Sequence, residues 1–542
     1  MKRRDFLQRS LVTGPALAAG GSLLSACQGH SNQVQAQLPP PYHFGLAEVS
    51  IDELQRRQEA GGLSALILTE AYLERIYELN DALQAVININ PDATKIAIAL
   101  DQERAESGPR GPLHGIPILL KDNIDTQDPM PTTAGSIALA ENYARRDAFL
   151  VAQLRKAGAV ILGKTNLSEW ANFRSTRSSS GWSSQGGQTR NPYALDCSPC
   201  GSSSGSGVAV AANFCSVAIG TETDGSIICP SALCGVVGIK PTLGLISRTG
   251  IIPIAHSQDT AGPMARTVRD AAILLSALTG VDPEDPATAN QRAEADYTAF
   301  LDENSLGGAR IGVMRSSFGV HEKLDAAIEN ALEVLRKAGA TLIDLERVTP
   351  ADEPYKGSEF EVLLYEFKND LNAYLAQTDA KVPIKNLQEL IDFNEAQREQ
   401  AMPYFEQEIL RMAVEKGPLT DRAYSEALAK SKRLTQAEGL DAVMDQHQLD
   451  AIVGPSDAPA WKIDLVNGDH YIMGGKASYS PAAVAGYPNI TIPAGYVHDL
   501  PVGISFMGRA YSEPRLLGLA YAYEQLSRHR SAPDFTLIKT RR

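Results

Sequence analysis

Amphipathic stretches and short apolar runs alternate along most of this chain. In LSALILTEAYLERIYELN one helical face is apolar and the opposite face is charged, which predicts a helix beginning after Ser64. A continuous apolar run at residues 116–120 predicts a buried strand that ends at Lys121. The stretch RDAFLVAQLRKAGAVILGKTN predicts a second helix, a stop at Gly158 and a buried strand over residues 159–162. This alternation predicts an α/β protein with a largely covered sheet.

Two segments depart from the alternating pattern. Residues 168–207 are rich in Ser, Gly and Asn, which is typical of a flexible linker. They lie in mid-domain between predicted strands, so we interpret them instead as backbone that approaches a ligand closely. Residues 350–440 are more charged and predict helices that cover one side of the sheet. Residues 355–372 and 478–481 are candidate linings of a cleft, with a core or surface position as the alternative.

The composition limits the class of protein. The chain has 542 residues, of which 44% are hydrophobic and 21% charged, enough apolar material for one large core or two medium ones. The net charge of −14 argues against general binding to nucleic acid or anionic membranes, because both require an excess of Lys and Arg. A small molecule or a neutral polymer is therefore the expected partner.

The first residues have the features of an export signal. A basic start with the twin arginines Arg3 and Arg4 precedes an apolar stretch of small residues, so residues 1–36 are interpreted as a signal of the twin-arginine type and a linker. LSAC resembles a lipoprotein cleavage box, in which Cys27 becomes lipidated; cleavage after Ala36 is the alternative. Both outcomes predict an exported bacterial protein, either periplasmic after cleavage at Ala36 or anchored to the cell envelope through a lipid on Cys27.

The cysteines cluster in the middle of the chain. Five of the six lie between Cys197 and Cys234. The CSPC motif at Cys197 and Cys200 suggests a redox or zinc pair, but there is no second CxxC and no nearby histidine. Small buried thiols are therefore the default prediction, a Cys197–Cys200 disulfide is the alternative, and no metal site is expected.

Three positions together suggest nucleophilic catalysis without histidine. Lys121 follows a buried strand, so desolvation would lower its pKa and make it a general base. The serines at residues 202–204 lie in a glycine-flanked turn, and Ser226 follows Gly225 where successive backbone N–H groups could hold an oxyanion. Taken singly, each has an ordinary alternative: a surface lysine, loop serines and a turn.

A series of motifs in this chain resembles the amidase signature family. GGQTRNPY…CGSSSGSGVAVAANFCSVAIGTETDGSIICPSALCGVVGIKPT resembles its glycine- and serine-rich signature, and GPLHGIPILLKDNID, GAVILGKTNLSEW, SQDTAGPMARTVRDAAILLSALTG and LPVGISFMG resemble family blocks in the expected order. The resemblance covers about residues 50–530. It implies one catalytic domain at residues 41–535, built on a central mixed, mostly parallel twisted sheet with helices on both faces.

The resemblance also implies the catalytic residues. A serine nucleophile, a serine after a cis peptide bond and a lysine base fall on Ser226, Ser202 and Lys121, and a supporting hydroxyl falls on Ser203. The backbone N–H groups that would hold the oxyanion belong to Thr223, Asp224, Gly225 and Ser226. The implied reaction is hydrolysis of a carboxamide to an acid and ammonia through an acyl-enzyme, with no cofactor or metal and with a monomer as the expected state.

Two departures from the family pattern concern the substrate. Asp224 stands where a glycine is usual, which puts a carboxylate beside the oxyanion loop. Ile228 stands where many relatives have an arginine, so the pocket has less reason to bind a free carboxylate and favours an apolar acyl group. The chain most resembles exported bacterial peptide amidases, which act on C-terminal peptide amides. A broad-specificity aliphatic or aryl amidase is the alternative.

Three alternative functions differ from this mechanism. GSSSG could be the nucleophile elbow of an α/β-hydrolase, with Ser203 as nucleophile and His498 as base, but no hydrophobic strand precedes it. An exported solute-binding lipoprotein would fit the signal and the acidic composition, and release of ammonia from an amide would exclude it. A tRNA-dependent amidotransferase subunit is disfavoured, because export would separate it from charged tRNA.

Overall fold

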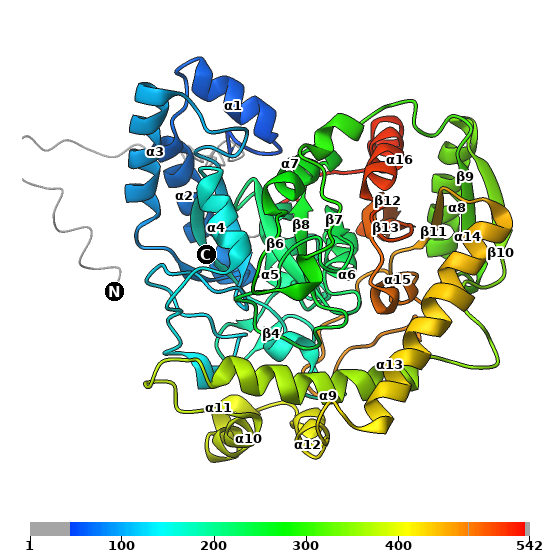
Figure 1. Cartoon of the computed structure of the whole chain (residues 1–542). Helices are drawn as coiled ribbons and strands as arrows, with labels where there is room; N and C mark the ends of the chain where they lie inside the picture. The colour runs from blue at the N-terminus through cyan, green and yellow to red at the C-terminus, as the bar shows by residue number, and fades with distance from the viewer. Residues whose placement is uncertain (1–43, 475, 537–542) are drawn as a thin grey trace, which may run out of the picture. The chain divides into compact units, whose positions relative to one another are not determined.

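A mixed eleven-stranded sheet forms the centre of the part of the chain that the computed structural model describes, residues 44–474 and 476–536 (Figure 1). From one edge to the other its strands are β1 (Val86–Ile89), β3 (Val160–Thr165), β2 (Pro117–Lys121), β6 (Val217–Glu222), β8 (Thr260–Ala265), β7 (Val237–Lys240), β12 (Asn489–Val497), β13 (Leu500–Met507), β11 (Ala451–Pro455), β9 (Arg310–Met314) and β10 (Thr341–Leu345). A separate two-stranded hairpin consists of β4 (Trp182–Ser183) and β5 (Gly187–Gln188).

The prediction of an α/β domain with a mixed sheet is confirmed, but the description of the sheet as mostly parallel is wrong. Six of the ten neighbouring pairs among the described strands are antiparallel. The difference has a physical cause: β12 and β13 form a direct hairpin, and β8 lies antiparallel between β6 and β7. Hydrophobic periodicity identifies buried strands but carries no information on their direction.

Helices flank the sheet and bury its apolar residues in one main core. The predicted helix after Ser64 is α2, and Ser64 Oγ accepts a hydrogen bond from the Ile67 N–H as its cap. The helices outside residues 350–440 are α1 (Ile51–Glu59), α2 (Ala65–Leu83), α3 (Ala93–Ser107), α4 (Phe149–Lys156), α5 (Ser204–Ala211), α6 (Ile228–Leu233), α7 (Val268–Leu278), α8 (Glu322–Lys337), α14 (Asp441–His447), α15 (Ser480–Ala485) and α16 (Glu513–Ser527).

Residues 350–440 are largely helical, and their longest helix packs on loops rather than on a face of the sheet. The helices are α9 (Lys356–Leu375), α10 (Leu387–Ala396), α11 (Arg398–Ala401), α12 (Glu408–Val414) and α13 (Arg422–Thr435). Leu363 and Phe367 of α9 share a second apolar cluster with Trp170, Phe173 and Ile254. Figure 1 shows α9 running across the ends of the neighbouring strands β6 and β8. This helix therefore lies over the loops at one end of the sheet, including the loop before β8.

The predictions for the N-terminal segment fall outside the described residues. Arg3, Arg4, Cys27 and Ala36 all belong to residues 1–43, of which no structure is described. Within the described residues, every helix is too short or too polar to span a lipid bilayer.

Candidate active site

Lys121 is fully buried and surrounded by hydroxyl groups. Its Nζ lies 2.8 Å from Ser202 Oγ, 3.0 Å from Ser203 Oγ and 2.8 Å from Thr221 Oγ1. Nζ also lies 3.1 Å from the Thr221 carbonyl oxygen. Burial lowers the pKa of Lys121 from 10.5 to about 7, against the smaller opposing effects of the Asp259 and Glu222 charges. The lysine is therefore substantially uncharged near neutral pH, as a general base must be.

The sheet explains why these residues meet. β2 pairs in parallel with both β3 and β6, so the carboxyl ends of the three strands lie at one edge of the sheet. Lys121 is the last residue of β2, and Thr221 is the penultimate residue of β6. Ser203 Oγ donates to the Thr221 carbonyl oxygen and accepts from the Thr221 N–H, which fixes the serine turn against the end of β6.

The turn before α5 has the geometry that the resemblance implies for Ser202. The peptide bond between Gly201 and Ser202 is cis. A Cβ atom at position 201 would collide with Ser168 Oγ, so only glycine fits there. The Ser168 N–H donates to the Ser202 carbonyl oxygen at 3.1 Å, which holds the turn from the other side.

A disulfide joins the residue before the serine turn to α6, the helix that follows Ser226. Cys200 and Cys229 are bonded, with their Cα atoms 6.0 Å apart. The default prediction of thiols throughout and the alternative Cys197–Cys200 disulfide are therefore both wrong; the free buried thiols in the described chain are Cys197, Cys215 and Cys234. The partner of Cys200 is 29 residues distant in sequence, a pairing that spacing alone does not reveal.

Ser226 lies on a tight loop between β6 and α6 that we call the oxyanion loop, residues 223–226. Gly225 has a φ of 81°, and its Cα faces the ring of Tyr479 so closely that a Cβ would collide with it. The fully buried Glu222 accepts hydrogen bonds from the Ile227 and Ile228 N–H groups at 2.7 and 3.0 Å. The Ser203 N–H donates to the Ser226 carbonyl oxygen at 3.1 Å. These contacts hold the loop beside the serine turn.

Some of the predicted catalytic residues contact one another through side chains and others only through the backbone. Lys121, Ser202 and Ser203 are linked by direct side-chain contacts. Ser226 is tied to Ser203 through the backbone, while its hydroxyl has no hydrogen-bond partner within the described chain and lies in the wall of a cavity of about 260 Å³. A free hydroxyl facing a cavity is accessible to a substrate carbonyl.

The cavity at Ser226 is apolar and aromatic and has no cationic side chain in its lining. None of the described residues that line it is Lys, Arg or His. Its carboxylates, Asp224 and Asp469, are both tied to protein groups: Asp469 accepts from the Ser180 N–H and from Trp461 Nε1. The apolar and aromatic lining residues include Phe173, Ile254, Leu363, Trp461, Tyr471 and Tyr479. Leu363 and Tyr479 belong to the two predicted cleft segments.

Asp224, which departs from the family pattern, turns its side chain toward α9. Its carboxyl group hydrogen-bonds Glu359 of α9 and Ser480. Burial raises the pKa of both carboxyl groups, that of Glu359 well above its usual value. The pair can therefore share a proton.

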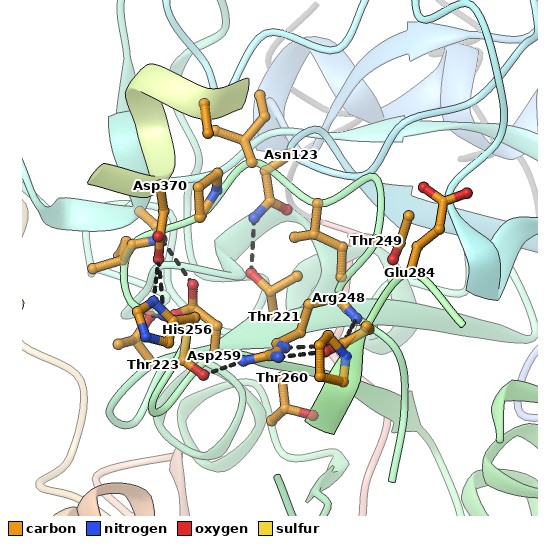
Figure 2. A pocket seen from close by; sticks show the side chains of 18 residues that line it. Asn123, Thr221, Thr223, Arg248, Thr249, His256, Asp259, Thr260, Glu284 and Asp370 are labelled. Atoms are coloured by element: carbon orange, nitrogen blue, oxygen red, sulfur yellow. Dashed lines mark hydrogen bonds and ion pairs between the residues drawn. The ribbon is translucent and has the colours of Figure 1, made fainter. Parts of the chain in front are cut away.

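A second cavity of about 350 Å³ lies on the other side of the oxyanion loop (Figure 2). Ala171, Thr223 and Ile254 line both cavities and so form the wall between them. Asn123 Nδ2 donates to Thr221 Oγ1 at 3.0 Å at one end of the second cavity, as Figure 2 shows. The Thr221 hydroxyl, which contacts Lys121, is therefore held in place by Asn123.

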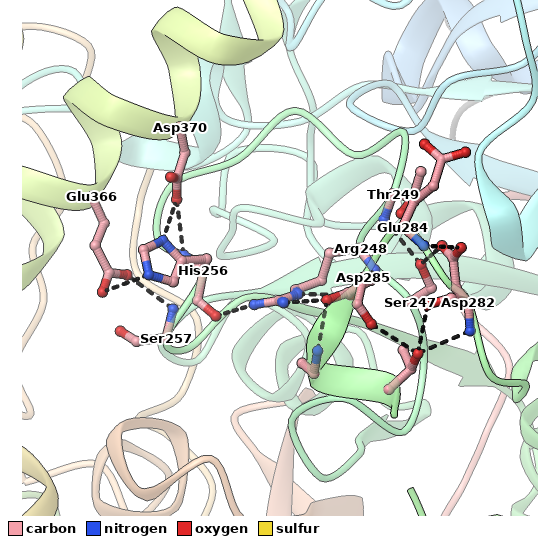
Figure 3. Close-up of polar contacts among 12 residues, drawn as sticks. Ser247, Arg248, Thr249, His256, Ser257, Asp282, Glu284, Asp285, Glu366 and Asp370 are labelled. Carbon is pink, nitrogen blue, oxygen red and sulfur yellow. Dashed lines mark hydrogen bonds and ion pairs between the residues drawn. The ribbon is translucent and has the colours of Figure 1, made fainter. Parts of the chain in front are cut away.

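Two groups of described side chains have the spacing of metal ligands, but in each the members bind one another. In the first, which includes Asp457, the sulfur atoms of Cys200 and Cys229 are joined in the disulfide. In the second, potential ligand atoms of His256, Glu366 and Asp370 lie within 4.8 Å of each other. His256 Nδ1 lies 2.8 Å from Asp370 Oδ2, and Nε2 lies 3.4 Å from Glu366 Oε1 (Figure 3). Both ring nitrogens are thus engaged by carboxylates, which raises the pKa of His256.

The alternative hydrolase elbow is not assembled. His498 is on the surface, where its Nε2 lies 2.9 Å from Lys323 Nζ. Ser203 is buried against Lys121 and Thr221. Sequence reasoning missed Thr221, Glu222 and Asn123, although Thr221 and Glu222 stand in the IGTETDG stretch that follows a predicted strand.

Comparison with known proteins supports the same chemistry. Residues 67–517 match the family model described as Amidase. The chain is 51% identical to the peptide amidase from Stenotrophomonas maltophilia of known structure, with a TM-score of 0.86, and the match covers 91% of this chain and 100% of that one. It is 40% identical to a probable amidase of Arabidopsis thaliana, over 91% of this chain and 92% of the relative. A putative amidase of Schizosaccharomyces pombe is 37% identical over 92% and 88% of the two chains.

These relatives correct one prediction. We expected an exported bacterial protein, periplasmic or lipid-anchored. The curated plant and fungal amidases that match nearly the whole chain are not exported bacterial proteins, so the prediction of localisation is wrong. The twin-arginine and lipobox patterns are short and therefore have low specificity. The prediction of export gave their resemblance to export signals too much weight.

Proposed function

Because this chain belongs to the amidase signature family and is an amidohydrolase, we propose that it hydrolyses C-terminal carboxamides of peptides to the free acid and ammonia. The observation that carries the proposed mechanism is the buried amine of Lys121, held among three hydroxyl groups with its pKa lowered to about 7. We assign the catalytic domain to residues 41–535 and propose a monomer, since one chain supplies all the groups that the reaction needs.

The first half-reaction forms an ester. Neutral Lys121 takes the proton of the Ser202 hydroxyl while Ser202 takes that of Ser226, and the Ser226 oxygen attacks the amide carbonyl carbon. The negative charge that develops on the carbonyl oxygen is held by backbone N–H groups of the oxyanion loop, Thr223, Asp224, Gly225 and Ser226. The C–N bond then breaks, the proton returns through Ser202 to the nitrogen, and ammonia leaves. Ser203 keeps Lys121 in place through its 3.0 Å contact.

The second half-reaction repeats the proton transfers with water. Ser202, with Lys121 behind it, takes a proton from a water molecule whose oxygen attacks the ester carbon. The Ser226 oxygen leaves and regains a proton, and the peptide acid is released. No electron transfer and no co-reactant other than water is involved.

The cavity favours a neutral acyl group. Its lining lacks a cation that would pair with a free carboxylate, and its aromatic and aliphatic side chains can cover apolar residues next to the amide. The 51% identity to a peptide amidase across nearly the whole chain supports the same substrate class. A peptide whose terminal carboxylate is masked as an amide has the neutral end that such a pocket accepts.

The test compares ammonia release from three substrate groups: N-acetylated peptide amides, free amino-acid amides and aryl anilides. We expect kcat/KM to be highest for the peptide amides and Ser226→Ala to abolish turnover with all of them. Equal kcat/KM across the three groups would favour a broad-specificity amidase instead. Binding without any ammonia release would favour a solute-binding protein.

A further inference from the structure

We propose that Gln258 and Asp259 are positioning residues for the oxyanion loop, held in register by an acidic face of α9. The proposal rests on the proposed function, in which this loop binds the oxyanion. Neither residue lines the cavity at Ser226, so each would act through Thr223 rather than on the substrate. The two residues stand in the SQDTAG stretch, for which sequence patterns predicted no catalytic role.

Thr223 forms hydrogen bonds to both residues through two of its atoms. Its Oγ1 donates to Asp259 Oδ1 at 2.6 Å, and its carbonyl oxygen accepts from Gln258 Nε2 at 3.2 Å. The Thr223 carbonyl and the Asp224 N–H belong to one planar peptide unit and point in opposite directions. A hydrogen bond that fixes this carbonyl therefore also fixes the direction of the Asp224 N–H, a donor of the oxyanion loop.

Asp259 ties the same loop to the wall between the two cavities. Its Oδ2 accepts from the Ile254 N–H at 2.8 Å and from the Ala255 N–H at 2.9 Å. Ile254 lines both cavities. Figure 2 shows Asp259 beside Thr223 at this wall. One carboxylate thus sets the distance between the oxyanion loop and a residue that would contact the acyl group.

α9 holds the segment before Asp259 through side chains on one face of the helix. Glu359, Glu366 and Asp370 are seven and four residues apart, a spacing that places them on one face. Leu363, on the same face, lines the cavity at Ser226. The three acids bind three consecutive residues. His256 N and Nδ1 lie 3.2 and 2.8 Å from Asp370, Ser257 N donates to Glu366 at 2.9 Å, and Gln258 Nε2 donates to Glu359 at 3.3 Å. Glu366 also lies 3.4 Å from His256 Nε2.

Figure 3 shows His256 and Ser257 directed toward Glu366 and Asp370 of α9. The Glu366 carboxylate also accepts from Tyr424 of α13 at 2.7 Å, so the helices themselves are linked. These contacts along the helix leave the segment little freedom to slide along α9. Gln258 and Asp259 are therefore presented to Thr223 from a fixed support.

The two residues differ in one measurable respect, because only Asp259 carries a charge. The Asp259 carboxylate favours the protonated form of Lys121. Asp370 and Arg248 also carry charges that interact with Asp259. Neutralising Asp259 should consequently make Lys121 easier to deprotonate, whereas removing the amide of Gln258 should leave the lysine unchanged.

The experiment measures kcat and KM for a peptide amide in Gln258→Met, Asp259→Asn, Thr223→Val and Thr223→Ser. A misplaced oxyanion donor lowers kcat by about 10- to 100-fold with KM nearly unchanged. We expect this loss in the first three variants and recovery of most activity in Thr223→Ser, which keeps the hydroxyl. In Asp259→Asn alone, the acid limb of the kcat/KM profile should move to lower pH. Asp344→Asn, on the exposed side of β10, is the matched control and should behave as wild type.

A second measurement separates positioning from loss of folding. A peptide aldehyde forms a tetrahedral adduct with the serine, so its Ki should rise in parallel with the loss of kcat, while thermal unfolding midpoints report the folded state. Unchanged kcat in Gln258→Met, a loss confined to KM, or equal activity of the two Thr223 variants would overturn the proposal. Failure of wild-type protein to release ammonia would instead refute the proposed function.

Discussion

Two buried lysines on neighbouring strands show how the surroundings of an amine decide its use. Lys121 ends β2 and Lys164 lies on β3, with Leu120 and Lys164 paired in the parallel register. Both side chains are fully buried. Lys121 is surrounded by hydroxyl groups, whereas Lys164 Nζ contacts the Ile124 carbonyl oxygen and lies 2.9 Å from Thr132 Oγ1.

Burial lowers the pKa of both amines, and the acidic charges that oppose this lowering differ between the two sites. At Lys164 they are Asp122 and Asp125, with smaller contributions from Asp128 and Asp147, and at Lys121 they are Asp259 and Glu222. Burial raises the pKa of Asp122 to about 7 and that of Asp125 to about 6, and the Lys164 charge opposes both increases. Lys164 and its acids therefore form a mutually supporting buried cluster. Both amines have only hydroxyl and carbonyl groups within hydrogen-bond distance, but Lys121 contacts two serine hydroxyls, those of Ser202 and Ser203, which can pass on a proton. Equal burial is thus compatible with a structural role for Lys164 and with the role of base for Lys121.

The largest effect expected from this comparison is the loss of activity in Lys121→Met. Removing the base of a serine nucleophile lowers kcat by about 10⁴-fold or more, because the residues of such a set act as a unit. Ammonia release in single- and multiple-turnover assays measures the loss, and circular dichroism checks the fold. Turnover within tenfold of wild type in the folded variant would remove Lys121 from the mechanism.

Lys164→Met should have the opposite effect. It should lower the free energy of unfolding and leave kcat of the folded protein nearly unchanged. Deleting one partner of a buried charge cluster costs about 3–5 kcal/mol, since the remaining carboxylates lose their counter-charge. The free energy of unfolding in urea measures this change. Adding Asp122→Asn to Lys164→Met should restore part of the stability, because it removes one of the uncompensated acids. A kcat of the folded Lys164→Met protein as low as that of Lys121→Met would break the distinction between the two lysines.

The sequence identified the strand end at Lys121 and, through the resemblance, the positions of Ser202 and Ser226. It did not identify the contacts that hold them, such as Asp259 to Thr223, because these join segments that come together only in the folded chain. The same reason explains the missed Cys200–Cys229 disulfide and the missed role of α9. Local patterns predict an element and its burial, whereas the direction of a strand and the partner of a side chain depend on the whole topology.

The pH dependence of kcat/KM is the smallest of the expected effects. It also addresses the difference between the two lysines most directly. Lys121 accepts a proton only in its neutral form, so kcat/KM should be low in acid and rise through an apparent pKa of about 7, falling about tenfold per unit below it. Measurements between pH 5 and 9 in wild type and in Lys164→Met define the limb. The limb should remain in place in Lys164→Met, because the Asp259 and Glu222 charges that oppose the burial of Lys121 are unaffected. A limb that moved by more than one unit in Lys164→Met would show that the two amines titrate as one system, and the division between a structural lysine and a base would no longer hold.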